Sequence, residues 1–344
     1  MSYDVDHSTS GTIFEYNVSH DNEGGFFLMC PYDKPTRNFT IRYNLSVNDK
    51  TRLFQTCSGD LVGGRIYKNT IAVGEGLSPI IVQAPANLSL DVLFANNIVR
   101  KSGSGSVTWD IPSSQFNVTS NIFYGAIGKY ADATGTITEA PQLAAPGLRD
   151  PNAYLLLANS PALGSAIIVD ADAVKDFFSN PTTQSRNLGF YSGHATKLPQ
   201  WISNFDDSNL SSWSTSEASV VADPAGDLGK SLKLEAQGTA TRRCTFTTKV
   251  QLDARVWFSS TTGNRNPPSI KIGRNTVAFR NVSKFDVGFW RVLEILVTAD
   301  GSAHATLDGE QVPVSLDSSS SSQRITISAG EHPIYVDDVF IVPT

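Results

Sequence analysis

The chain has 344 residues, of which 17% are charged, and its formal net charge of −6 corresponds to a pI near 5.4. This acidic balance argues against a nucleic-acid or anionic-membrane partner, because such partners need a basic face. No apolar run approaches the roughly 18–20 residues of a membrane-spanning helix. The length and the abundance of Ser, Thr, Asn and Gly predict about two domains of an extracellular, all-β protein.

Asparagines recur at a nearly constant spacing in the N-terminal half. Their separations are 27, 25, 27 and 25 residues, and each Asn stands three residues after an apolar one. A period of this size predicts a solenoid in which every turn is one supersecondary unit. Stacked side chains about 4.8 Å apart could hydrogen-bond one another as a ladder, although an Asn that only tolerates a left-handed turn also explains each position. The expected rungs are Asn17, Asn44, Asn69, Asn96 and Asn121.

A second column keeps the 27-residue step. The segments 26–30, 53–57, 80–84 and 107–111 are short, β-branched or aromatic, and bounded by turn residues, which predicts strands. Cys30 and Cys57 share this column on adjacent turns. Their Cα atoms are therefore expected near the strand spacing, where a disulfide and a pair of stacked thiols both fit. Cys244 is expected to be a lone core thiol, because no Cys/His spacing indicates zinc.

Several motifs carry the repeat and its C-terminal end. They are TIFEYNVSHDNEGG (12–25), FTIRYNLSVND (39–49), IYKNTI (66–71), LFANNIV (93–99) and VTSNIFYG (118–125), followed by LLANSPALGSA (156–166), DFFSNP (176–181) and NLGFYS (187–192). In these motifs, residues 1–198 resemble the right-handed parallel β-helix proteins of the pectin-lyase-like superfamily, and the last three resemble the capped final turn. The resemblance implies a ligand or substrate that is an extracellular polysaccharide. The superfamily includes polysaccharide lyases, glycoside hydrolases, esterases and non-catalytic adhesins, so the resemblance does not choose among lyase, hydrolase, binding protein and structural solenoid.

The repeat ends before residue 199, and a different pattern begins at residue 205. Residues 199–204 are expected to be a linker, and alternating strands with polar turns across 205–344 predict an antiparallel β-sandwich. This part resembles jelly-roll carbohydrate-binding modules. That resemblance implies a structural Ca²⁺ near terminal acids, here Asp206 and Asp338, with Asp207 and Asp337 beside them.

Aromatic rings are natural platforms for sugars, because sugar C–H faces pack on them. Trp213, in a Ser-rich loop, and Trp257 are the expected carbohydrate-binding residues, whereas Trp290 lies in an apolar run and is expected in the core.

An acidic cluster near the N-terminus is the candidate catalytic site. It comprises Asp4, Asp6, His20, Asp21 and Glu23, with His7 between them. Carboxylates on neighbouring turns could serve as general acid and base on a glycosidic bond or hold a catalytic Ca²⁺, and a histidine could move a proton near neutral pH. The alternative is that Asp, Asn and His simply form turns.

Two features bear on the chemistry of this cluster. The predicted strand 26–30, which follows the turn at Asp21 and Glu23, contains no carboxylate. Some β-helix glycosidases that this region resembles carry an acid on that strand. The basic residue that lyases of the superfamily use could be Arg42, Arg52, Arg65 or Lys68, although Glu15 and Arg42 are more simply an ion pair on neighbouring turns. No cofactor is required by any of these interpretations.

The beginning of the chain predicts a fragment of a secreted glycoprotein. No signal peptide precedes the repeat, and the first turn starts almost at Met1, so upstream turns and a secretion signal are expected in a longer protein. We expect a monomer, since nothing indicates trimerisation. The Asn-x-Ser/Thr sequons are Asn17, Asn38, Asn44, Asn87, Asn117, Asn209 and Asn281.

Overall fold

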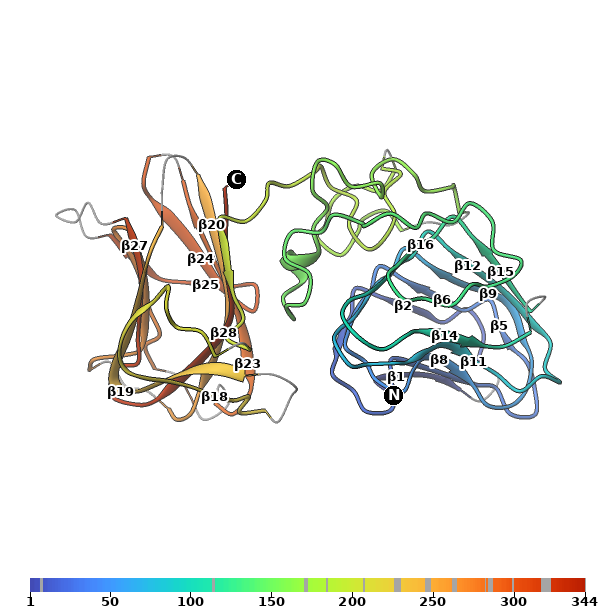
Figure 1. The fold of residues 1–344 in the computed structure, drawn as a ribbon, viewed down its shortest axis with the longest axis horizontal. Coiled ribbons are helices and arrows are strands. Elements are labelled where there is room, and N and C mark those ends of the chain that lie inside the picture. The colour runs from blue at the N-terminus through green and yellow to red at the C-terminus, as the bar shows by residue number, and fades with distance from the viewer. Residues whose placement is uncertain are drawn as a thin grey trace. The chain divides into compact units, whose positions relative to one another are not determined.

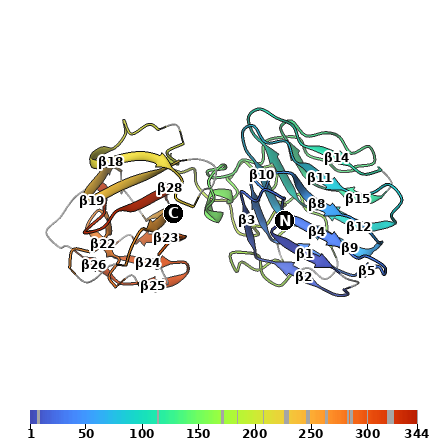
Figure 2. The same cartoon turned by 90° about the horizontal axis from the view of Figure 1, so that it is seen from below.

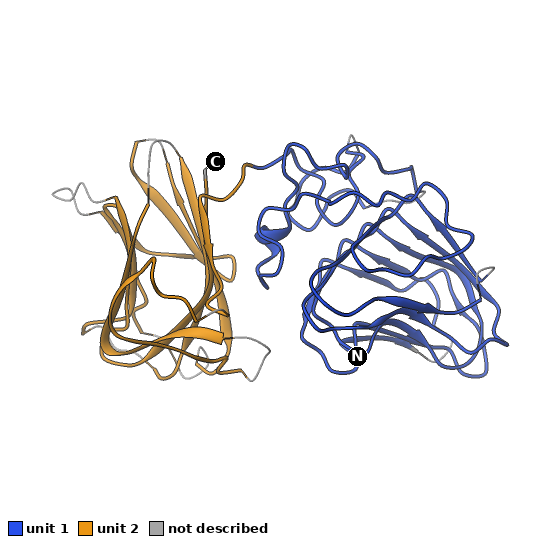
Figure 3. Ribbon diagram, viewed as in Figure 1, with its two compact units in different colours: residues 1–196 blue, residues 197–344 orange. Residues whose placement is uncertain are grey.

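The computed structural model describes residues 1–6, 9–112, 115–169, 173–183, 185–206, 208–225, 230–244, 249–261, 265–281, 283, 287–298, 300–316 and 323–343 (Figure 1). It divides into two compact units, unit 1 (residues 1–196) and unit 2 (residues 197–344), coloured in Figure 3. Within the described ranges, helical structure is limited to one 3₁₀ turn, η1 (Pro151–Tyr154), and no helix there is long and apolar enough to cross a membrane.

Unit 1 is a parallel β-solenoid of about four turns, whose strands stack as three parallel sheets in the described residues (Figure 2). The chain visits the first, second and third sheet in order on every turn. The first sheet contains β1 (Tyr3–Asp6), β4 (Phe27–Cys30), β8 (Arg52–Thr56), β11 (Ile80–Gln83) and β14 (Thr108–Asp110). The second contains β2 (Ile13–Glu15), β5 (Thr36–Arg37), β6 (Thr40–Arg42), β9 (Leu61–Tyr67), β12 (Leu90–Ala95) and β15 (Phe116–Thr119). The third contains β3 (Val18–His20), β7 (Leu45–Val47), β10 (Thr70–Val73), β13 (Ile98–Lys101) and β16 (Ile122–Tyr124).

A column of aromatic rings fills the inside of the solenoid. Phe26 lies 5.6 Å from Phe54, Phe54 lies 5.9 Å from Phe94, and Phe94 lies 5.8 Å from Trp109, all measured between ring centres. The three phenylalanines have no exposed surface. Edge-to-face packing of this kind adds to the burial of apolar area, so these rings from successive turns stabilise one turn against the next.

The asparagine ladder is present, with one correction. Side-chain amides donate from Asn17 to Asn44, from Asn44 to Asn69, from Asn69 to Asn97 and from Asn97 to Asn121, at 2.9–3.1 Å. The fourth rung is therefore Asn97, and the prediction of Asn96 is wrong. Asn96 has a φ of 56° and occupies the left-handed turn position that precedes each rung. The corresponding residues on the other turns are Tyr16, Tyr43, Lys68 and Ser120.

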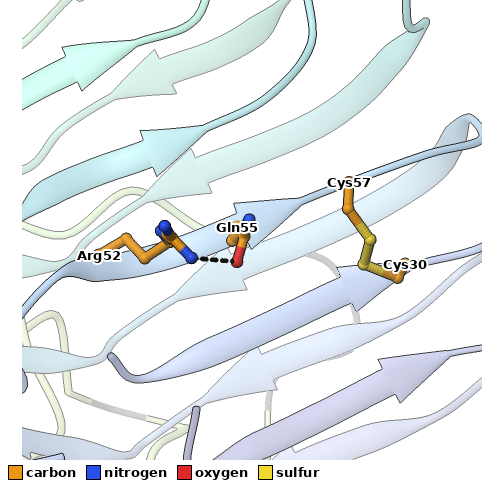
Figure 4. Close-up of a disulfide and its surroundings, with 4 residues drawn as sticks. All are labelled: Cys30, Arg52, Gln55 and Cys57. Atoms are coloured by element: carbon orange, nitrogen blue, oxygen red, sulfur yellow. Dashed lines mark hydrogen bonds between the residues drawn. A yellow bond between two sulfur atoms is a disulfide. The ribbon is translucent and has the colours of Figure 1, made fainter. Parts of the chain in front are cut away.

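Cys30 and Cys57 form a disulfide between neighbouring turns of the first sheet (Figure 4). Their Cα atoms are 5.2 Å apart, close to the spacing of adjacent strands. On β8, the strand that ends just before Cys57, Arg52 Nη1 donates to Gln55 Oε1 at 2.9 Å (Figure 4). The bridge thus joins two consecutive turns covalently near the N-terminal end of the solenoid.

The segment 140–196 lies against the outer face of the third sheet. The Phe190 main-chain N–H donates to Thr70 Oγ1 at 3.2 Å, and the Asn96 side chain bonds the main chain of Ile167 in both directions. A Cβ on Gly189 would lie 2.6 Å from Thr70 Oγ1, so only glycine permits this approach. The segments 156–166, 176–181 and 187–192, which were expected to cap the last turn, therefore belong to the part that covers the third sheet. Residues 127, 134 and 137 instead form isolated β-bridges with residues of the final turn.

Unit 2 is antiparallel, and its strands form one nearly closed sheet in the described residues. Its core is apolar and includes Leu252, Val256, Phe258, Ile295 and Ile327. Trp201–Ser203, expected in the linker, form β17 and pair with β28. The strands are β17 (Trp201–Ser203), β18 (Ser214–Ala222), β19 (Lys230–Arg243), β20 (Val250–Phe258), β21 (Ser269–Ile272), β22 (Asn275–Ala278), β23 (Trp290–Val297), β24 (Ala303–Leu307), β25 (Glu310–Val312), β26 (Val314–Leu316), β27 (Arg324–Ser328) and β28 (Ile334–Pro343).

Candidate functional site

Asp21, a member of the predicted catalytic cluster, lies in a buried ion pair. It is 9% exposed and accepts hydrogen bonds from Arg149 Nε at 2.7 Å and from His20 Nδ1 at 3.1 Å. Burial opposes the charge on Asp21, but the hydrogen bond from His20 and the charge of Arg149 outweigh it, so the pKa of Asp21 is lowered. A carboxylate held ionised in this way is a poor proton donor. The pair instead ties the segment 140–196 to the first turn of the solenoid.

The remaining acids of the cluster lie on other parts of the first turn. Glu23, in the turn that follows the third sheet, pairs with Lys50 of the next turn, and its side chain is 83% exposed. Asp4 is exposed on β1 of the first sheet, and Asp6 lies on the same strand opposite Cys30. His7 lies outside the described residues. The structure therefore distributes the predicted cluster over the first sheet, a surface turn and the covered side of the third sheet.

The basic candidates lie on other strands and turns than these acids in the described residues. The predicted ion pair between Arg42 and Glu15 is confirmed, with Nε 2.7 Å from Oε2. Lys68 is 2% exposed, and its ammonium lies 5.5 Å from the Tyr43 ring centre. Arg52 shares the first sheet with Asp4, but β4 lies between their strands. Arg65 is on the second sheet.

The expectation that Trp213 lies on the surface is wrong. Its side chain is 6% exposed and belongs to the core of unit 2. Its Nε1 donates to Ser203 Oγ at 3.1 Å, and its ring centre is 5.7 Å from that of Trp201. The guanidinium of Arg242 lies 4.1 Å from the Trp201 ring centre. The Trp213 ring therefore packs against residues of β17 and β19 in the core of unit 2.

Trp257 belongs to a row of aromatic side chains on the outer face of the same sheet. Trp290 on β23, Trp257 on β20 and Tyr335 on β28 are direct cross-strand partners. Val256 and Phe258, the sequence neighbours of Trp257, point into the core and are at most 1% exposed. The three rings are partly exposed and lie outside the core cluster. Because adjacent strands are about 4.8 Å apart, the row extends roughly 10 Å across the sheet.

Buried polar side chains hold one end of this row. Trp290 Nε1 donates to both carboxylate oxygens of Asp223, at 3.1 and 3.2 Å. The Arg255 guanidinium lies 4.5 Å from the Trp290 ring centre, and Arg255 is 2% exposed. At the other end, Lys233 of β19 is the cross-strand partner of Tyr335. The row therefore combines a Trp290 ring held by polar contacts with a charged side chain at its other end.

Trp290 and Tyr335 are members of the row that reasoning from sequence did not select. Trp290 was expected in the core, but Leu293, Ile295 and Val297 are the inward residues of its strand. Counting back in steps of two from Leu293 places Arg291 on the inner face and Trp290 on the outer face. The two-residue alternation was the signal that could have found it.

The acids expected to bind Ca²⁺ make other contacts. Asp206 is exposed and accepts from the Lys230 main-chain N–H at 2.8 Å and from Asn204 Nδ2 at 3.1 Å. Asp338 is 1% exposed, and Arg255 Nη1 lies 3.5 Å from its Oδ2. Across the described parts of the chain, no group of three or more His, Cys, Asp or Glu is arranged to hold a metal ion. Asp207 lies outside the described residues.

Comparison with known proteins adds only distant similarities. No family model and no curated protein matches the chain. The cellulose-induced protein Cip1 is similar with a TM-score of 0.35 and 12% identity, over 42% of this chain and 98% of that one. Domain 4 of AbnA, an extracellular arabinanase from Geobacillus stearothermophilus solved with arabinotriose, gives 0.30 and 9%, over 42% and 91%. The receptor-binding domain of botulinum neurotoxin mosaic serotype C/D gives 0.30 and 11%, over 38% and 43%. Similarities this distant carry no argument about function.

Proposed function

We propose that the protein binds an extracellular polysaccharide through the aromatic row of unit 2 and does not cleave it. The observation that carries this proposal is the register of Trp290, Trp257 and Tyr335, which are partly exposed side by side on three neighbouring strands. Sugar rings present apolar C–H faces that pack on aromatic rings, and their hydroxyls take hydrogen bonds from polar groups at the rim. A row across three strands suits consecutive sugar units of a chain.

The rigidity of the row favours binding. Trp290 is held by its hydrogen bonds to Asp223 and by the guanidinium of Arg255. Side chains ordered before the ligand arrives lose less conformational entropy on binding. A fixed platform is therefore expected to discriminate among glycans by shape.

The ion pairs of two predicted catalytic acids support binding without cleavage. Asp21 is committed to Arg149, and Glu23 to Lys50. The disulfide between Cys30 and Cys57 supports an extracellular location, because such bonds persist mainly in oxidising compartments.

Isothermal titration of the whole chain with a panel of soluble polysaccharides tests the proposal. For any polysaccharide that binds, we expect Trp257→Ala and Trp290→Ala each to weaken binding at least tenfold, or about 1.4 kcal/mol. Leu316→Ala is the matched control, because Leu316 is an exposed apolar residue (55%) on β26, outside the row. Undiminished affinity of both Trp variants, or release of oligosaccharide products from a bound polysaccharide, would contradict the proposal.

A further inference from the structure

A polar groove crosses the outer face of the second sheet of the solenoid. Its volume is about 520 Å³, and it is lined by strands of three successive turns, β9, β12 and β15. The side chains that give it its character are Asn38, Arg65, Asp91, Leu93, Gln115 and Asn117. None of these belongs to the predicted acidic cluster or to the aromatic row of unit 2, so the groove is a separate feature.

The groove begins at a β-bulge in β9. Leu61 pairs with Leu90 and Gly64 with Val92, so two residues of β9 face the single residue Asp91. One of the two is Gly63, whose φ is +67° and whose N–H donates to Asp91 Oδ2 at 2.9 Å. Neither glycine places a side chain in the groove: a Cβ on Gly63 would lie 2.7 Å from Asn38 Oδ1, and a Cβ on Gly64 would lie 2.4 Å from the buried Phe39 ring in the core. The bulge therefore brings Gly63 against Asn38 and Asp91 where the groove begins.

A row of side chains runs along the groove parallel to the solenoid axis. Arg65 is the cross-strand partner of Leu93, and Leu93 is the partner of Asn117. These residues are therefore about 4.8 Å apart from one turn to the next. Arg65 and Leu93 are partly exposed, and Asn117 is exposed. The groove thus offers a repeating series of contacts: guanidinium, apolar side chain and amide.

The chemistry of the groove, including the carboxylate of Asp91, fits a neutral glycan. Guanidinium, carboxylate and amide groups are planar and forked, so each can bond two neighbouring groups of a ligand at once, as adjacent sugar hydroxyls require. The opposite charges of Arg65 and Asp91 cancel, so an anionic chain gains no net attraction. Leu93 supplies an apolar surface for a sugar face.

We propose that this groove is a second glycan-binding site, in which a neutral oligosaccharide lies along the solenoid axis with successive sugar units over successive turns. It extends the proposed polysaccharide binding to unit 1 but does not depend on the aromatic row. One polysaccharide chain that reaches both sites at once would be held more tightly than by either site alone.

The test uses the whole chain in a background that lacks the unit 2 platform. The double variant Trp257→Ala/Trp290→Ala is titrated by calorimetry with neutral hexasaccharides of glucose, xylose, arabinose and mannose, and with hexagalacturonate for comparison. We expect at least one neutral hexasaccharide to bind with a stoichiometry of one. Adding Arg65→Ala or Asn117→Ala should weaken that binding at least tenfold, and Leu93→Trp, which fills the groove, should do the same.

Arg37→Ala is the matched control, because Arg37 is an exposed arginine of the same sheet that does not line the groove. It should leave the affinity unchanged, and circular dichroism should show that every variant is folded. The proposal is overturned if the double variant binds none of the neutral hexasaccharides, if it prefers hexagalacturonate, or if the groove substitutions change nothing. A different result would contradict the proposed function of unit 2. That result is unchanged polysaccharide binding by the triple variant Trp257→Ala/Trp290→Ala/Leu93→Trp, in which both sites are removed.

Discussion

Replacing Asn69 by alanine would remove the central rung of the asparagine ladder. The Asn69 side chain donates to the main-chain carbonyls of Ile41 and Tyr67 and to Asn97 Oδ1, at 2.9–3.2 Å. Its Oδ1 accepts from the main-chain N–H and the side-chain amide of Asn44, at 3.1 and 2.9 Å. Asn69 has no exposed surface, so water cannot replace these partners without entering the solenoid.

The expected loss of stability is about 3 kcal/mol. Leaving the buried Asn44 N–H without its acceptor costs about 1–3 kcal/mol, and the volume lost inside the turn adds a cavity term. With an m-value of about 3 kcal/mol/M in urea, the unfolding midpoint of unit 1 should fall by about 1 M.

The two units can be followed separately in one urea titration. Trp109 lies in unit 1, whereas Trp201, Trp213, Trp257 and Trp290 lie in unit 2. Tryptophan fluorescence therefore reports mainly on unit 2, and far-ultraviolet circular dichroism reports on both. Asn69→Ala should lower the urea midpoint of the part of the dichroism transition that reports on unit 1. The midpoint of the main fluorescence transition, which reports on unit 2, should not change.

The control is Asn17→Ala at the N-terminal end of the same ladder. Asn17 is partly exposed and donates its amide to Asn44 Oδ1 at 2.9 Å. Asn44 Oδ1 keeps its hydrogen bond from the main-chain N–H of Asn17, at 3.0 Å, when the side chain is removed, so we expect a loss of only about 1 kcal/mol. Equal effects of the two substitutions, or no effect of Asn69→Ala, would refute the view that the buried amides bond one turn to the next.

Four further outcomes follow from the buried ion pair and the cysteines. The pKa of Asp21 is lowered, so the stability it contributes is present above its unfolded pKa of about 3.9 and is lost as the pH falls below it; Asp21→Asn should flatten the acid limb of a stability-versus-pH curve. Replacing Arg149 by Met leaves the Asp21 charge buried and should cost about 3 kcal/mol by urea unfolding. Reducing the disulfide of Cys30 and Cys57, which closes a 27-residue separation, should cost about 3.5 kcal/mol. Burial raises the pKa of the Cys244 thiol to about 12, so a chromogenic disulfide reagent at pH 8 should react with it only after unfolding.

The solenoid could be predicted from sequence because its signals are periodic. One Asn per turn and one apolar segment per turn keep the same step for several turns, and a shared spacing needs no knowledge of distant contacts. The fourth rung was misassigned because Asn96 and Asn97 are adjacent and both keep the approximate spacing. The left-handed φ of Asn96 and the ladder hydrogen bonds of Asn97 distinguish the turn residue from the rung.

The candidate sites depend on contacts between residues far apart in the chain. Asp21 and Arg149 are 128 residues apart in sequence, and no local pattern connects them. Trp213 was expected on the surface because its neighbours are serines, but its burial follows from the pairing of β17 with β28. Trp257 could be named because the chain has only five tryptophans, whereas its neighbours in the row are set by the register of three strands.

Two-dimensional NMR of the tryptophan indole N–H groups during a glycan titration tests the aromatic row most directly. The signals are assigned by replacing each tryptophan with phenylalanine in turn. We predict that the indole signals of Trp257 and Trp290 shift with a common saturation curve, while that of the buried Trp213 stays in place. Saturable binding of a polysaccharide that leaves the Trp257 and Trp290 signals unmoved would contradict the assignment of the row as its binding site.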